Sequence, residues 1–167
     1  MRRGHTASDY LRRISAIKNA RRRMAITSDI IVGFPGETDA DFRDTLKLVE
    51  QAGYDGLYIF KYSERPRTPA AKLNDDVSRE EKTARFLELE KMQQQLQRKI
   101  YARYVGRDIK VLVERHSSKS DRDMTGHSTC HKVVNFPGSS ASLGAVVSVR
   151  VTEAKRNSLY GDLITAS

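Results

Sequence analysis

Residues Asp29–Thr38, with the sequence DIIVGFPGET, combine the features of a ligand-binding turn. The apolar run predicts a strand, and Gly33 and Gly36 predict a turn that leads from this strand into a helix. Glycines let a ligand approach the backbone closely, and unpaired amides at a helix start suit an anionic or polar group. In α/β folds, ligands bind at this end of a strand. The alternative is a turn that needs glycine only for its geometry.

Cys130 is the only cysteine, which excludes an internal disulfide and any metal cluster held by three or four cysteines of this chain. With His127 and His131 it forms a His-x-x-Cys-His string that resembles a metal site. Side chains in a strand alternate between its two faces, so these three ligands do not converge well. We therefore predict no metal site and no catalytic residue here, but a polar hairpin edge.

Charge is unevenly distributed along the 167 residues. The chain has a net charge of +9, made up of +7 in residues 1–25, −4 in residues 26–97 and +6 in residues 98–167. Two basic ends around an acidic middle indicate a polyanionic partner, most simply a nucleic acid. The alternative is a solvated basic surface. No apolar run is long enough to span a bilayer and no secretory signal is evident, so we expect a cytoplasmic protein without a membrane partner.

The first 100 residues predict alternating helices and strands. Three helix starts are marked by a hydroxyl residue followed three positions later by an acid, at Thr6, Thr38 and Ser78. Apolar runs at 30–32 and 57–60 predict buried parallel strands between the helices. The order α-β-α-β-α indicates a segment of an α/β sheet or barrel that lacks neighbouring strands.

The pattern changes after Gly106. Alternating residues near 109–113, and further runs at 132–136 and 146–151, predict short strands joined by turn-rich connectors. We predict a small antiparallel barrel of about 60 residues, with the domain boundary near residue 105. The polar stretch 117–128 predicts a mobile hairpin loop.

Three strings in the first part resemble successive signatures of radical S-adenosylmethionine methylthiotransferases of the MiaB type: MRRGHT at 1–6, DIIVGFPGET at 29–38 and YSERPRTPA at 62–70. Strings in the last part are similar to the family's RNA-binding TRAM domain, namely VLVE at 111–114, VVNFPG at 133–138 and LYG at 159–161. The resemblance implies a partial radical S-adenosylmethionine (TIM-like) barrel in residues 1–105. For residues 106–167 it implies a TRAM (OB-like) domain.

The resemblance also implies contacts to S-adenosylmethionine. The strand and turn of this family lie against the adenine and ribose of the cofactor, which assigns Ile31, Val32, Gly33, Phe34, Pro35, Gly36, Glu37 and Thr38 to cofactor binding. Arg3 and Arg65 match family arginines near the site, where a guanidinium can hold a carboxylate or a phosphate. The alternative for both is an ordinary surface arginine. Arg67 departs from the family, which usually has glycine at this position.

The family's two [4Fe-4S] clusters are each held by three cysteines, and none of those six cysteines is present here. The chain therefore resembles the carboxyl-terminal portion of the enzyme, beginning near the helix before the fifth barrel strand. We expect neither cluster to be ligated by this chain, and we expect no activity from the chain alone.

For the tail, the resemblance and the charge both predict tRNA binding. The predicted RNA-contacting residues are Arg107, Lys110, Arg115, Lys119, His127, Lys132, Asn135, Arg150 and Arg156. Small barrels bind RNA through basic grooves with an occasional aromatic platform, here Phe136 or Tyr160. The alternative for Phe136 is a place in the core, which we favour.

The function implied by the resemblance is the transfer of a methylthio group to C2 of N6-isopentenyladenosine next to the tRNA anticodon. We expect a monomer that contributes the carboxyl-terminal part of this enzyme. Two alternatives remain open at this point. One is a stand-alone RNA-binding remnant without catalysis, and the other is a methylthiotransferase that acts on a ribosomal protein.

Overall fold

A computed structural model describes residues 4–20, 24–118 and 120–164. The chain divides into two compact units, one ending at Leu96 and the other beginning at Gln97, which are called the first and the second unit below. No helix in the described ranges is long and apolar enough to cross a bilayer.

The first unit contains the predicted alternation of helices and strands. Its elements are α1 (Ala7–Lys18), β1 (Thr27–Val32), α2 (Asp39–Ala52), β2 (Gly56–Lys61), a short 3-10 helix (Pro69–Lys72) and α3 (Arg79–Ala102), whose last turns belong to the second unit. The two strands pair in parallel, in a register that runs from Thr27 opposite Gly56 to Val32 opposite Lys61. The predicted order and the parallel pairing are both confirmed.

The predicted helix starts are also confirmed. Thr6 and Thr38 each form a capping box, in which the hydroxyl accepts from the amide three residues on and the acid at that position accepts from the cap amide. Ser78 and Glu81 exchange the same two hydrogen bonds at the start of α3. Gly53 ends α2 in the left-handed conformation, with φ at 52°.

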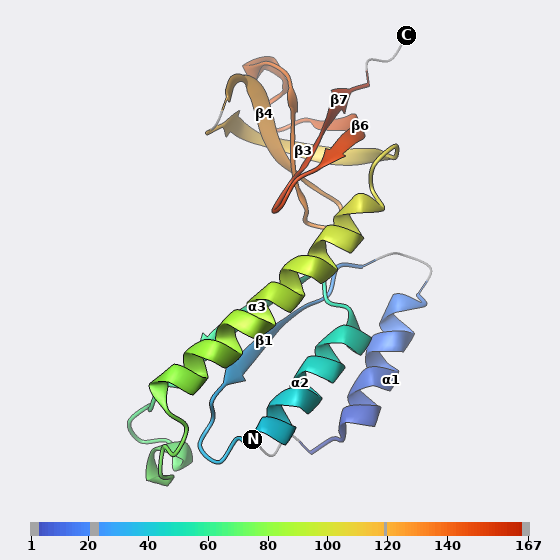
Figure 1. Cartoon of the computed structure of the whole chain (residues 1–167). Coiled ribbons are helices and arrows are strands. Elements are labelled where there is room, and N and C mark those ends of the chain that lie inside the picture. The colour runs from blue at the N-terminus through green and yellow to red at the C-terminus, as the bar shows by residue number, and fades with distance from the viewer. Residues whose placement is uncertain (1–3, 21–23, 119, 165–167) are drawn as a thin grey trace. The chain divides into compact units, whose positions relative to one another are not determined.

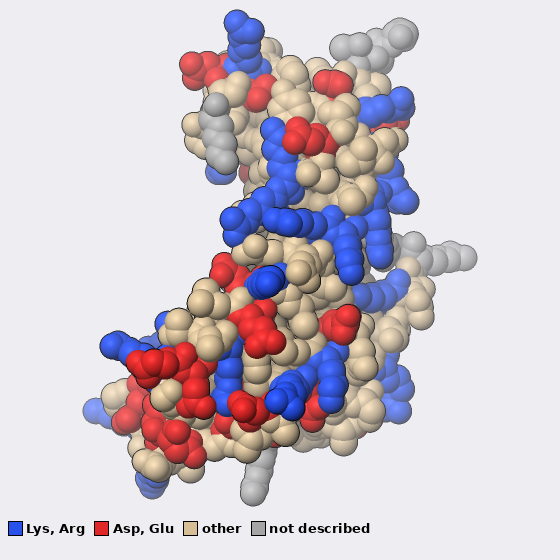
Figure 2. Space-filling view, in the orientation of Figure 1, with Lys and Arg blue, Asp and Glu red and all other residues tan. Residues whose placement is uncertain are grey.

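All three helices of the first unit lie on one side of the two-stranded sheet (Figure 1). Val32, Phe42, Val49 and Leu89 form the buried core on that side. The other face of the sheet exposes apolar side chains, so the strands predicted to be buried are covered on one face only among the described residues, as expected for a sheet that lacks neighbouring strands. In Figure 2, many Asp and Glu side chains lie on the visible face of this unit, whose residues 26–96 carry a net charge of −4.

The second unit is built from five strands. They are β3 (Asp108–Ser117), β4 (Ser120–Ser128), β5 (Val133–Pro137), β6 (Val146–Ala154) and β7 (Leu159–Leu163). Each strand pairs with two neighbours in the order β3-β4-β5-β7-β6, and β6 pairs back with β3, which closes a ring (Figure 1). We call this arrangement the strand ring. Four pairings are antiparallel, but β5 and β7 are parallel, which corrects the expectation of a purely antiparallel sheet.

The polar stretch 117–128 is not a loop. Ser117 ends β3 and residues Ser120–Ser128 form β4, which pairs with both β3 and β5. Its inward residues Met124 and Gly126 alternate with the outward Asp123 and His127. The strand escaped prediction because its inward positions include a glycine and its outward positions, such as Asp123, Thr125 and His127, are polar.

The interior of the strand ring is filled by apolar side chains from all five strands. Its fully buried members are Val111, Val113, Met124, Val134, Phe136, Val149, Val151 and Leu159, with Tyr101 and Tyr104 from the end of α3 and the turn after it packed against them. Phe136 is therefore a core residue, as we favoured, and not an RNA platform.

Two glycines allow neighbouring strands of the ring to approach closely. A Cβ atom at Gly126 would lie 2.0 Å from the Leu112 carbonyl oxygen, and one at Gly161 would lie 2.2 Å from the Arg150 carbonyl oxygen. These are backbone atoms, which cannot move aside as a side chain does. The ring therefore requires glycine at both positions.

We expect Gly161→Ala to lower the free energy of unfolding by about 2 kcal/mol or more, because the added methyl overpacks against the backbone of β6. Urea unfolding followed by circular dichroism measures this loss. Gly56→Ala is the matched control, since its Cβ would lie 3.6 Å from Thr27 Cγ2, an ordinary contact. Equal stability of the two variants would contradict the close approach.

Candidate functional site

The two motifs predicted for cofactor binding lie at the same edge of the sheet. Because β1 and β2 are parallel, the turn after β1 and the loop after β2 both leave from this edge. The Tyr62 amide donates to the Val32 carbonyl oxygen at 2.8 Å, and the rings of Phe34 and Tyr62 meet edge to face with centroids 5.2 Å apart. The structure thus brings residues 31–38 beside the loop that carries Arg65. Arg3 lies outside the described residues.

The turn between β1 and α2 is held by its own hydrogen bonds. The Gly33 amide donates to Glu37 Oε2 at 2.6 Å, and the Gly36 amide donates to Asp76 Oδ1 at 2.7 Å. The Thr38 amide donates to Asp41 within the capping box. The Gly33, Gly36 and Thr38 amides are therefore paired with acidic side chains of the chain, which corrects the expectation of unpaired amides at these three positions.

Glu37 is held in place by Arg85 of α3. Arg85 Nη1 donates to Glu37 Oε2 at 2.9 Å and to the Glu37 carbonyl oxygen at 3.0 Å, and Nη2 donates to Asp39 at 2.9 Å. The Arg85 and Glu37 side chains are only 8% and 12% exposed. Burial opposes the charge of Arg85, but the hydrogen bonds that its guanidinium donates to Asp39 and Glu37 outweigh this effect and raise the Arg85 pKa. Glu37 is thus committed to the fold and positions the turn.

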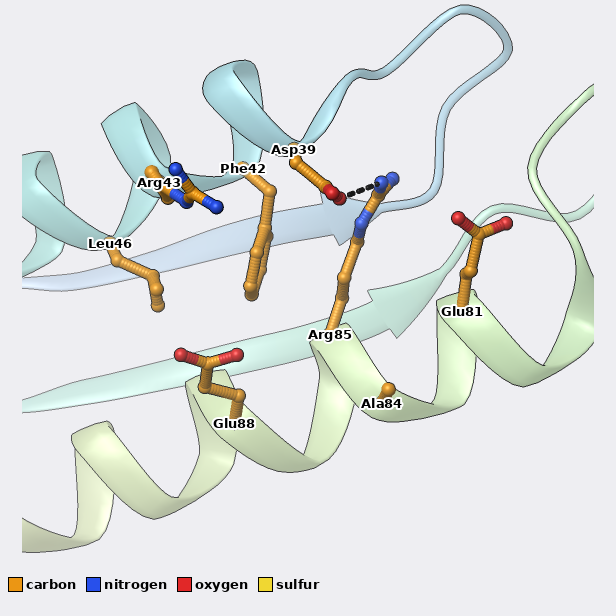
Figure 3. Close-up of a pocket in the computed structure, with 8 residues that line it drawn as sticks. All are labelled: Asp39, Phe42, Arg43, Leu46, Glu81, Ala84, Arg85 and Glu88. Atoms are coloured by element: carbon orange, nitrogen blue, oxygen red, sulfur yellow. Dashed lines mark hydrogen bonds and ion pairs between the residues drawn. The ribbon is translucent and has the colours of Figure 1, made fainter.

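A groove of about 360 Å³ lies between α2 and α3 (Figure 3). Phe42 and Leu46 project into it from α2, and Arg85 and Glu88 from α3. Its one buried cation, Arg85, is already neutralised by two carboxylates. We therefore assign this groove a structural role.

The exposed sheet face offers the apolar surface that an adenine ring requires. Ile31 on β1 pairs with Phe60 on β2, and both side chains are exposed on the face away from the helices. Tyr58 is 62% exposed on the same face. Val32 points the other way into the core, so its side chain cannot contact a ligand here. Sequence reasoning did not single out Tyr58 and Phe60, although the two-residue period of a strand places both on one face of β2.

Arg67 adopts a backbone conformation that favours glycine. Its φ is +66°, a left-handed conformation that costs a non-glycine residue on the order of 1 kcal/mol. It lies in a turn in which Thr68 donates to the Arg65 carbonyl oxygen through both its amide and its hydroxyl. The position where the family resemblance implies glycine is thus one where the backbone conformation favours it.

On the second unit, one group of residues surrounds a pocket of about 250 Å³ on the outer face of β4, β5 and β7, which we call the Tyr160 pocket. Arg115 and Asn135, two of the predicted RNA-binding residues, line it. Arg156 lies in the turn between β6 and β7, whose neighbouring residues Lys155 and Asn157 also line it. The Tyr160 hydroxyl donates to Asp123 Oδ1 at 3.2 Å. Burial, followed by the charge of Asp123, raises the Tyr160 pKa, so the hydroxyl keeps its proton at neutral pH.

Two other predicted residues, Lys110 and His127, line a separate pocket on the second unit. Lys110 Nζ donates to Ser148 Oγ at 2.8 Å. His127 Nδ1 lies 2.8 Å from Glu114 Oε2, and its ring stacks on His131 at 4.6 Å. The Glu114 carboxylate gives this pocket a negative group that opposes phosphate binding.

The remaining predicted RNA contacts differ in accessibility. Lys132 is 3% exposed, with its ammonium 5.2 Å from the Tyr101 ring and 5.4 Å from the Tyr104 ring, so it stabilises the core and not an RNA surface. Arg150 is exposed but forms a two-point ion pair with Asp108, which raises the Arg150 pKa. Arg107 is exposed, and Lys119 lies outside the described residues.

Cys130 and its neighbouring histidines do not assemble a metal site. Within residues 4–20, 24–118 and 120–164, no group of three or more His, Cys, Asp or Glu side chains is placed to hold a metal ion. His127 and His131 stack on each other, and His127 faces Glu114. Nothing in this geometry supports an iron–sulfur cluster on the chain.

Comparison with known proteins places these features in context. Residues 102–164 match the TRAM domain family. Over 98% of its length the chain is 46% identical to a protein of Alkalilimnicola ehrlichii named tRNA-2-methylthio-N(6)-dimethylallyladenosine synthase. Proteins with the same name from Methylococcus capsulatus and Pseudoalteromonas translucida are 43% and 42% identical over the same share. The chain spans 37%, 36% and 34% of these three relatives, about a third of their length.

We expect Arg85→Met to lower the free energy of unfolding by about 2–3 kcal/mol, because it leaves the Glu37 carboxylate buried without its cation. Urea unfolding measures the loss. The exposed Arg43 of the same groove is the matched control, and Arg43→Met should change stability by less than about 0.5 kcal/mol. A second change, Glu37→Gln, should restore part of the loss. Equal effects of the two methionine variants would show that Arg85 does not hold the turn.

Proposed function

We propose that the chain is the carboxyl-terminal portion of a tRNA methylthiotransferase that modifies C2 of an N6-isopentenyl-type adenosine beside the anticodon. One observation carries this proposal: 98% of the chain is similar, at up to 46% identity in the comparisons above, to proteins named for that reaction. The match of residues 102–164 to the TRAM domain family supports an RNA substrate. A tRNA substrate in turn favours the cytoplasm.

Residues 1–105 are the proposed carboxyl-terminal part of a radical S-adenosylmethionine barrel. The exposed face that carries Ile31 and Phe60 supports this, because a barrel segment covered by helices on one side leaves the other side for its interior. Ile31 and the Phe34 turn fit the apolar side of the cofactor, whereas the Glu37 carboxylate is committed to Arg85. The adjacent Arg65 is exposed and suits an anionic group.

S-adenosylmethionine and the two [4Fe-4S] clusters supply the radical chemistry, the methyl group and the sulfur when they are bound to the intact enzyme. The residues of this chain do not fit a cluster, because Cys130 is its only cysteine. The cluster ligands must come from outside this chain, and the chain alone should not methylthiolate tRNA. What its own residues contribute is cofactor contact, turn positioning and RNA binding.

Residues 106–167 are the proposed RNA-binding part. The second unit's exposed cations support this, with Arg115 lining the Tyr160 pocket, Arg156 in the turn beside it and Arg107 at the start of the strand ring. Lys132 is not part of this proposed interface, because its side chain is buried. A stand-alone RNA-binding module is the second candidate, favoured by the single cysteine. The relatives' names favour tRNA over a ribosomal protein as the substrate.

We expect the chain to bind tRNA with an affinity that falls steeply between about 50 and 200 mM salt, because binding displaces counterions from phosphates. Arg115→Gln and Arg156→Gln should each reduce the slope of log affinity against log salt by about one. Filter binding measures both quantities.

Arg43→Gln on α2 is the control for these two variants, because it removes an equally exposed arginine of the first unit. It should leave the salt slope unchanged. Binding that is insensitive to salt, or equal losses in all three variants, would contradict an RNA interface on the second unit.

A further inference from the structure

The Tyr160 pocket has the size and chemistry of a site for a single planar group. Its volume of about 250 Å³ lies just below the range of about 300–1,000 Å³ that is typical of drug-sized ligand sites. Its walls combine one aromatic ring, two amides, several hydroxyls, one carboxylate and two cations. The residues that line the pocket include Arg115, Asp123, Thr125, Asn135, Lys155 and Tyr160.

Three of these side chains form a row across neighbouring strands. Thr125 on β4 pairs with Asn135 on β5, and Asn135 pairs with Tyr160 on β7. Thr125 Oγ1 donates to Asn135 Oδ1 at 2.7 Å, which fixes the orientation of the amide. Among the described residues, the Asn135 amide nitrogen has no hydrogen-bond partner. It therefore remains as a donor at the pocket, and Oδ1 keeps a second lone pair.

The ring of Tyr160 is tethered at its hydroxyl end, and a flexible lysine side chain lies over the ring. Its hydroxyl is held by Asp123, and Lys155 Nζ lies 4.5 Å from the ring centroid. A cation–π contact at an exposed site is weaker than the stacking of a nucleobase on an aromatic ring. A base can therefore displace the ammonium from the ring face, and the displaced ammonium is then placed to bind a flanking phosphate, as is Arg115.

We propose that the Tyr160 pocket holds one unstacked base of single-stranded RNA, stacked on Tyr160 with its edge hydrogen-bonded to Asn135. Single-stranded RNA is recognised in this way, through stacking on aromatic rings and hydrogen bonds to exposed base edges. The proposal rests on the proposed RNA-binding function and adds to it the residues that bind a base, not a phosphate. The pocket lined by Lys110 and His127 lacks this combination, because neither a phenolic ring nor a side-chain amide lines it.

The test measures binding of the full chain to a short fluorescein-labelled single-stranded RNA by fluorescence anisotropy. Tyr160→Ala should weaken binding about tenfold, and Asn135→Ala about threefold. Tyr160→Phe, which keeps the ring, should bind nearly as the natural chain does. Leu87→Ala is the control, because it truncates an exposed apolar side chain of the first unit outside the candidate sites and should leave the affinity unchanged.

A second arm begins with the natural chain, so that its first comparison does not depend on the folding of any variant. Oligonucleotides that lack the base at one position each are compared with the intact strand. One position should show a loss of about tenfold, and at that position Tyr160→Ala should cause no further loss. A loss that is equal and small at every position would overturn the base site.

The outcomes separate the two proposals. If the arginine variants and added salt weaken binding but Tyr160→Ala and the abasic strands do not, the chain binds RNA through phosphates alone and the base pocket is wrong. If the natural chain binds neither tRNA nor single-stranded RNA at low salt, the RNA-binding function fails and the pocket proposal fails with it.

Discussion

Closure of the strand ring is the constraint on which the second unit depends. Each strand pairs on both sides, and the close backbone approach at Gly126 and Gly161 lets five short strands complete the circuit. Closure sends alternate side chains inward to the core and outward to water. The parallel β5–β7 pairing then sets Asn135 beside Tyr160, residues 25 positions apart in the sequence. The outer-face pocket is thus a consequence of how the ring closes.

The first unit depends on a different interaction, the buried contact of Arg85 with Glu37. Through this contact α3 holds the turn after β1. Within the turn, the Gly33 amide donates a hydrogen bond to the Glu37 carboxylate. What remains open at this edge of the sheet is apolar surface, around Ile31 and Phe60. The unit therefore combines a rigid turn with a face that suits a flat, apolar group.

The alternation of helices and strands was predictable because capping boxes and apolar periods are local signals, as at Thr38 and along residues 30–32. β4 was not predictable, because polar residues at positions such as Asp123 and Thr125 look like a loop until neighbours pair with them. The contact of Lys132 with Tyr101 joins residues about 30 positions apart in the sequence. The contact of Arg85 with Glu37 joins residues 48 positions apart. Contacts of this kind depend on the tertiary fold, which residue type and spacing do not specify.

Activity in a complete enzyme tests whether the chain is the carboxyl-terminal portion of a tRNA methylthiotransferase. A chimera in which residues 1–167 replace the similar third of the Alkalilimnicola ehrlichii relative can be expressed in cells that lack their own methylthiotransferase. Mass spectrometry of nucleosides from their tRNA then shows whether the modification is present. We expect 2-methylthio-N6-dimethylallyladenosine among the nucleosides of this tRNA. A chimera that accumulates and holds its clusters, yet leaves the tRNA without the methylthio group, would contradict it.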